Sequence, residues 1–122
     1  MTAGYQICQV AHALTEFIFK FPFLSYYWRK KSNYLAVLSV QQEAGLLSLW
    51  HQLEAQKIRH TIFKEPDIGG QITAIAIEPS ETSRKLCAGI PLALKNISNG
   101  INKHNFKNKN NKTNMRACLG AV

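Results

Sequence analysis

The stretch that decides the fold is Phe63–Pro79, FKEPDIGGQITAIAIEP. Its second half, Gln71–Ile77, is rich in Ile, Thr and Ala, a composition typical of a β-strand. Its first half holds two acids, Glu65 and Asp67, around Pro66 and ends in two glycines. Pro66 fixes its own φ and pushes the residue before it towards extended backbone. We therefore expect an acidic loop at the mouth of a strand, where functional residues tend to lie.

The segments around this stretch show their own periodicities. Apolar residues recur at spacings of three and four in Gly4–Phe19 and Glu43–Gln56, which predicts two amphipathic helices. The apolar run Tyr34–Val40 predicts a buried strand. The aromatic run Phe17–Trp28 fits either a second short helix or a loop that covers the core. The last elements that we expect are a strand at Arg59–Phe63, a helix at Ser80–Ala88 with Ser80 as its N-cap, and a short strand or terminal segment at Ile90–Leu94.

The order of these elements predicts the fold class. Helices and strands alternate along the chain, and 122 residues leave room for one domain with one modest core. Such alternation favours an α/β domain, a small mixed β-sheet with helices on both faces. We expect this domain to occupy residues 1–94.

From Lys95 onwards the composition changes abruptly. Residues 95–114 contain eight asparagines and five lysines, and few apolar side chains. Such a segment buries too little surface to offset the entropy lost on ordering, so we expect a disordered tail over residues 95–122. The formal net charge of +8 divides into +2 before residue 95 and +6 from residue 95 onwards. The basic character therefore belongs mainly to the tail, which can bind phosphates without specificity.

A smaller basic cluster, Arg29–Lys31, lies within the expected domain. It is interpreted either as a solvated turn or as a contact for phosphate.

The three cysteines, Cys8, Cys87 and Cys118, lie far apart and form no Cys-x-x-Cys pair. This spacing argues against a zinc site or a disulfide framework, so we expect reduced thiols. No apolar run approaches the length of a membrane span, and the start of the sequence lacks the pattern of a signal peptide. We expect a cytoplasmic protein without a membrane partner.

Gln9 and His12 are the first candidate site residues. They lie three residues apart on the first predicted helix and therefore share a face. Ala11 and Ala13 keep that surface narrow, so that a backbone or a ligand can approach it closely. The alternative for His12 is a structural hydrogen bond between the helix and the sheet.

Glu65, Asp67 and Thr73 are the other candidates. Either carboxylate can orient or activate a water molecule, and the alternative is a solvated acidic turn. The Thr73 hydroxyl can line the same pocket, whereas its alternative is the ordinary preference of threonine for strands.

Four segments together resemble the type II peptidyl-tRNA hydrolase family, and more closely its bacterial peptidyl-tRNA hydrolase-like branch. They are GYQICQVAHA (4–13), YLAVLSV (34–40), FKEPDIGGQITAIAIEP (63–79) and IPLAL (90–94). Gly4, Gln9, His12 and Ala13 match the family's first-helix pattern G-K-x-x-x-Q-x-x-H-A. Gly70, Thr73 and Pro79 match its later strand segment.

The resemblance implies a four-stranded mixed sheet between helices and an enzyme that hydrolyses the ester between a peptide, or an N-blocked amino acid, and the 3′ end of tRNA. The resemblance also implies that tRNA is the partner and that the reaction needs no metal or organic cofactor. Gln9 and His12 would then line the site, Glu65 or Asp67 would orient water, and Thr73 would support them. The alternatives are a noncatalytic RNA- or protein-binding module that retains the fold, and a degraded gene product.

This sequence departs from the family pattern at three points. Tyr5 stands where the family has a lysine at the start of the helix, and a phenol supplies no fixed positive charge. The family's catalytic aspartate falls nearest Glu65, in a shorter loop. The family's first strand comes before this helix and is expected to be missing here, which would leave an inner sheet position without its partner. A homodimer through the exposed sheet or a helix surface would cover it.

Overall fold

The computed structural model describes residues 3–93 and 116–121, which form helices α1 to α4, one short 3₁₀ helix and strands β1 to β4. Their order is α1 (Ala3–Lys20), α2 (Pro22–Lys31), β1 (Tyr34–Ser39), α3 (Glu43–Ala55), β2 (His60–Glu65), η1 (Pro66–Ile68), β3 (Gln71–Ile77), α4 (Glu81–Cys87) and β4 (Arg116–Ala121).

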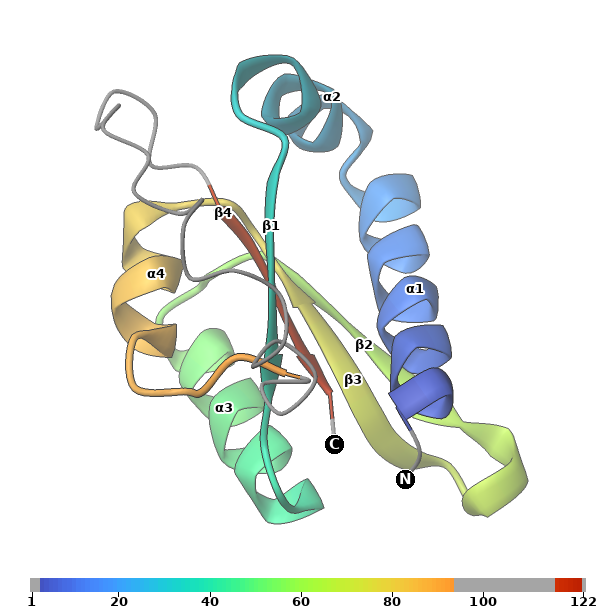
Figure 1. The fold of residues 1–122 in the computed structure, drawn as a ribbon. Helices are drawn as coiled ribbons and strands as arrows, with labels where there is room; N and C mark the ends of the chain where they lie inside the picture. Colours follow the sequence, from blue (N-terminus) through green and yellow to red (C-terminus); the bar gives the residue numbers. More distant parts are fainter. Residues whose placement is uncertain (1–2, 94–115, 122) are drawn as a thin grey trace, which may run out of the picture.

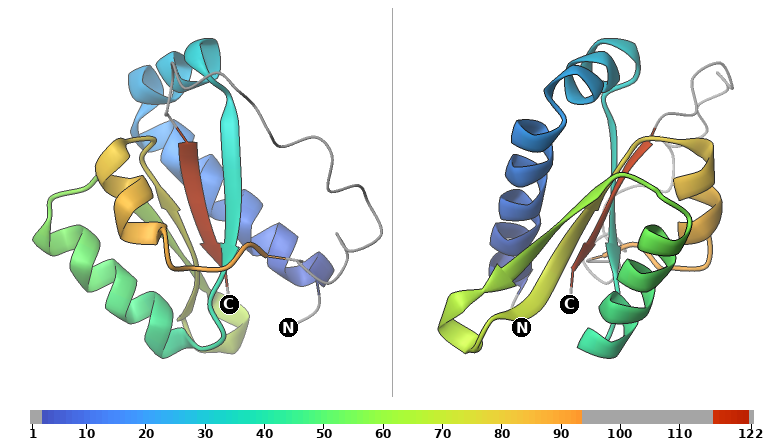
Figure 2. Two further views of the ribbon diagram at one scale, coloured as in Figure 1. Left: turned by 60° about the vertical axis from the view of Figure 1, so that its left-hand side comes forward. Right: turned by 180° about the vertical axis from the view of Figure 1, so that it is seen from behind.

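The strands form one mixed sheet in the order β1-β4-β3-β2. Strand β1 pairs with β4 in parallel, whereas β4 with β3 and β3 with β2 are antiparallel. Helix α1 covers one face of the sheet, and α3 and α4 cover the other (Figures 1 and 2). The predicted α/β class, a small mixed sheet with helices on both faces, is confirmed.

Each face of the sheet has its own core, because β3 is buried on both sides. Ile75 and Ile77 pack with leucines of α3, including Leu46 and Leu53, whose side chains are fully buried. The small residues of β3 face α1 instead, and pack with Val10, Ala13 and Phe17. The buried face of α3 consists of Leu46, Leu49 and Leu53, whereas Trp50 at its margin is only partly buried.

A β-bulge in β3 decides where Thr73 points. Phe63 pairs with Ala74, and the next residue of β2, Lys64, pairs with Ile72, so Thr73 is the extra residue. In a regular strand Thr73 would share the α3 face with Ile75. The bulge turns its side chain to the α1 face, where its hydroxyl reaches Gln9. Bulges commonly re-aim a side chain in this way.

Strand β1 is an edge strand, which explains why the prediction of a fully buried strand at Tyr34–Val40 was wrong. Its first two residues are exposed, and only Leu38 is fully buried. Of the segment expected as a short strand or terminal segment at Ile90–Leu94, the described part, residues 90–93, reaches this edge. It pairs there through a single bridge, Leu38 with Leu92, and two flanking backbone hydrogen bonds.

Strand β4 corrects two expectations. The predicted disordered tail, residues 95–122, includes Arg116–Ala121, and for these residues the prediction was wrong. They form the strand between β1 and β3, so the inner position expected to lack a partner is filled within this chain. Their apolar sequence, ACLGA after Arg116, is the signal that the Asn/Lys-rich composition around it hid. The rest of the predicted tail lies outside the described residues.

The aromatic run forms a helix, which decides between the two interpretations left open. Pro22 begins α2, where its missing N–H is no loss.

Among the described residues, no helix on its own has the length and apolar character to cross a membrane. Helices α1 and α2 meet those criteria only as a pair, and a bend of 110° separates them.

We predict that Leu119→Pro destabilises the domain. Leu119 pairs with Val37 on one side and Ala76 on the other, and proline removes a ladder donor from an inner strand. A buried carbonyl left without a donor costs about 1–3 kcal/mol of unfolding free energy. Urea denaturation of the variant and the wild type measures this loss. Leu119→Val, which keeps the backbone donor, is the control. An unchanged urea midpoint for the proline variant would mean that β4 does not stabilise the sheet.

Candidate active site

Small residues of helix α1 and a hydrogen bond from β2 bring the helix close to the sheet. Ala13 is fully buried, which lets the helix backbone come close to β2. The Thr61 hydroxyl donates to the Ala13 carbonyl oxygen at 2.9 Å. One turn earlier along α1, this close approach brings Gln9 over the bulge of β3.

A buried chain of hydrogen bonds starts at Thr73. The Thr73 hydroxyl donates to Gln9 Oε1 at 2.7 Å, and Gln9 Nε2 donates to Glu65 Oε2 at 2.8 Å. These two bonds fix the orientation of the amide, because a flipped Gln9 would place its oxygen against the carboxylate. Gln9 is 2% and Thr73 0% exposed, so both lie beneath the surface.

The Glu65 carboxylate collects several donors. Besides Gln9, it accepts a hydrogen bond from the backbone N–H of Asp67 at 3.3 Å, as the cap of η1. Gly69 and Gly70 both adopt positive φ, at 75° and 77°, and close the loop so that the Gly70 N–H reaches the Glu65 carbonyl. The Gln9 hydrogen bond, followed by the Asp67 N–H, lowers the pKa of Glu65 below its ordinary value of 4.5.

Tyr5 lies one turn before Gln9 on α1 and reaches the same carboxylate. Burial, together with the hydrogen bond to Glu65 and its charge, raises the pKa of the Tyr5 phenol above 10.0. Tyr5 therefore stays protonated and donates to Glu65. The phenol replaces a charge by a hydrogen bond at the position where the family pattern has lysine.

His12 stacks on Phe63 of β2, with ring centroids 4.6 Å apart and planes inclined by 12°. Its ring is exposed, unlike Gln9 on the same helix face. The proximity of His12 also contributes to the low pKa of Glu65. The His12 imidazole is therefore an accessible side chain next to the carboxylate.

The structure brings four of the five predicted site residues together: Gln9, His12, Glu65 and Thr73. Asp67 is exposed and reaches the group through its backbone N–H. Sequence reasoning missed the contribution of Tyr5, although its spacing of four from Gln9 signals the same helix face. It also missed Phe63, whose contact with His12 depends on how the helix lies on the sheet.

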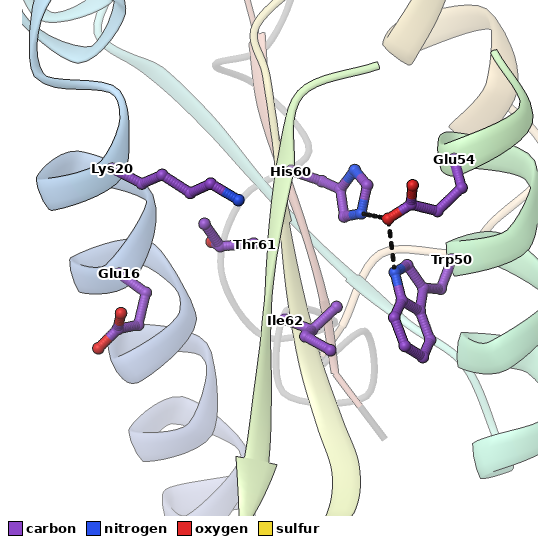
Figure 3. Close-up of a pocket in the computed structure, with 7 residues that line it drawn as sticks. All are labelled: Glu16, Lys20, Trp50, Glu54, His60, Thr61 and Ile62. Atoms are coloured by element: carbon purple, nitrogen blue, oxygen red, sulfur yellow. Dashed lines mark hydrogen bonds and ion pairs between the residues drawn. The ribbon is translucent and has the colours of Figure 1, made fainter. Parts of the chain in front are cut away.

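A separate pocket of about 340 Å³ straddles the edge strand β2, away from this group (Figure 3). In it, His60 Nε2 lies 3.2 Å from the Glu54 carboxylate, which also accepts from Trp50 Nε1 at 3.3 Å. None of the five predicted site residues lines it. Within residues 3–93 and 116–121, no group of three His, Cys, Asp or Glu side chains is arranged to hold a metal ion.

Comparison with known protein families identifies a match. A family model described as "Peptidyl-tRNA hydrolase PTH2" matches residues 1–86, which include all five predicted site residues. Comparison with curated proteins gives no match.

We predict that Glu65→Gln removes part of the acid sensitivity of the fold. Because the pKa of Glu65 is lower in the folded than in the unfolded protein, its stabilisation is complete above pH 4.5 and is lost as the pH falls through the folded pKa. In urea denaturation, the free energy of unfolding of the wild type should exceed that of Glu65→Gln most at neutral pH. The difference between the two proteins should shrink below pH 4.5.

Glu81→Gln is the matched control, because Glu81 is an exposed acid whose partner Lys85 is exposed as well. It should show a smaller dependence on pH. A wild-type advantage over Glu65→Gln that stays constant from pH 7 to pH 3 would contradict the assignment.

Proposed function

The chain belongs to the peptidyl-tRNA hydrolase PTH2 family, and on that premise we propose that it hydrolyses the ester between a peptide, or an N-blocked amino acid, and the 3′ end of tRNA. Its partner is then tRNA, and its place of action is the cytoplasm. Water is the second reactant. Its oxygen joins the acyl carbon, the bond from that carbon to the ribose oxygen breaks, and one proton of the water ends on this oxygen, which leaves as a hydroxyl.

One observation carries this proposal: an ionised carboxylate that is buried apart from a small exposed part lies beside an exposed imidazole. Glu65 is 8% exposed, so a narrow part of it reaches solvent. A carboxylate has about four lone-pair positions. Gln9, the Asp67 N–H and Tyr5 occupy three of them, which leaves a position suited to one water molecule.

The lowered pKa of Glu65 decides its role. A carboxylate with a low pKa is a weak base, so it serves better to orient water than to remove its proton. We assign Glu65 to orienting the attacking water and His12 to proton transfer at the leaving oxygen. Gln9 and Thr73, which are buried beneath Glu65, are positioning residues. Tyr5 supports the same carboxylate.

The second candidate function is a noncatalytic RNA-binding module that retains the fold. Tyr5 favours this function for two reasons. The phenol stands where the family has a positive charge, and its hydroxyl occupies one hydrogen-bonding position of the Glu65 carboxylate. In that case tRNA binds, but no ester is cleaved.

We predict that purified protein releases N-acetylated amino acid from N-acetylaminoacyl-tRNA, and that Glu65→Gln lowers the rate by about 10²-fold or more. The amide keeps the size of the side chain but removes the charge that holds the water. Release is measured by acid precipitation of labelled substrate at pH 7.

Two further variants sharpen this assay. Asp67→Asn should lose less activity, because its backbone N–H still reaches Glu65. Glu81→Gln, on the opposite face of the sheet, should retain the wild-type rate. Folded protein that binds tRNA but releases nothing would exclude the esterase and leave the binding module.

A further inference from the structure

Helix α2 exposes an unusual number of aromatic rings. Phe23 is 89%, Tyr26 61% and Tyr27 51% exposed. The helix is anchored from its other side, where Trp28 is buried and donates its Nε1–H to the Tyr34 carbonyl at 2.8 Å. The three rings therefore point outward from a fixed helix, which extends away from the sheet beyond the end of α1 (Figures 1 and 2).

Lysines lie over these rings. Lys30 Nζ is 5.6 Å from the centroid of Tyr26, and Lys31 Nζ is 5.5 Å from that of Tyr27. Between Glu16 and Glu43 the sequence contains no acid but four bases, Lys20, Arg29, Lys30 and Lys31. The surface therefore combines exposed rings with uncompensated positive charge, which suits an anionic partner.

We propose that this aromatic–basic surface of α2 binds single-stranded RNA, namely the 3′ end of tRNA; the identity of the RNA rests on the proposed function. Unpaired nucleotides offer both features that the surface matches, a base that stacks on an aromatic ring and a phosphate that pairs with an ammonium group. In a helix that lies on a membrane, lysines extend from the apolar face towards water. Here the ammonium groups lie over the ring faces, which favours nucleotides.

The position of α2 relative to the candidate active site fits this partner. Helix α1 carries His12 and, eight residues later, Lys20 just before α2. At a rise of 1.5 Å per residue these two positions are about 12 Å apart along the helix. About four stacked nucleotides span that length at 3.4 Å each. RNA bound on α2 therefore needs at least this many nucleotides beyond the start of the helix to place its terminal ribose near Glu65 and His12.

We predict that the double substitution Tyr26→Ala and Tyr27→Ala weakens RNA binding about tenfold or more, because each stacked base contributes appreciably to affinity. The probes are tRNA that carries no amino acid and a single-stranded oligoribonucleotide ending in CCA, both labelled. Their binding is measured by fluorescence anisotropy. Tyr26→Phe with Tyr27→Phe keeps the rings and should bind as the wild type does. Lys30→Gln with Lys31→Gln should reduce the salt dependence of binding.

A second readout separates this proposal from the esterase. The Tyr-to-Ala pair should raise KM for N-acetylaminoacyl-tRNA and leave the hydrolysis of N-acetylaminoacyl-adenosine unchanged, because that substrate lacks the RNA that α2 would hold. If neither substrate is cleaved, the proposed esterase activity is excluded. The binding measurements still test whether α2 binds RNA.

The proposal is overturned if the folded Tyr-to-Ala pair binds RNA as tightly as the wild type. It is also overturned if the wild-type protein binds vesicles of phosphatidylcholine and phosphatidylserine but not RNA, because α2 would then be a membrane-binding helix.

Discussion

The buried amide of Gln9 is the interaction on which the candidate active site depends. It accepts from Thr73 and donates to Glu65, and so joins α1, β3 and β2 at one point. Its two ends have opposite roles, and the Glu65 carboxylate, which can only accept, does not allow the amide to turn round. The same bond fixes the carboxylate in position and lowers its pKa. One side chain therefore contributes both to the packing of the helix on the sheet and to the charge state of the site.

The sheet supplies the geometry that this amide needs. The bulge at Thr73 turns the hydroxyl towards α1, and Ala13 lets the helix backbone approach β2. Strand β4 ends next to the bulge, since Ala121 pairs with Ala74. The start of α1 and the end of β4 lie at this same end of the sheet (Figure 1). A strand that is remote in sequence thus supports the backbone beneath the site.

The sequence reveals the fold class because alternating periodicities in Gly4–Phe19, Glu43–Gln56 and Gln71–Ile77 are local properties. It also indicates Gln9, His12 and Glu65, because spacing and loop chemistry are visible in a single segment. The bulge is not visible, since it depends on the register of β3 against β2. Strand β4 is hidden for a related reason. Its five apolar residues form only a short signal beside an Asn/Lys-rich segment, and the strand depends on partners that β1 and β3 supply on both sides.

We propose that Gln9 keeps Glu65 ionised at the place where the ester is cleaved. The most direct measurement is the pH dependence of single-turnover hydrolysis of N-acetylaminoacyl-tRNA by the wild type and by Gln9→Leu. The acidic limb of the wild-type profile should lie below pH 4.5, and it should move to higher pH in the variant, because the largest cause of the low pKa is removed. An acidic limb at the same pH in both proteins would contradict the account.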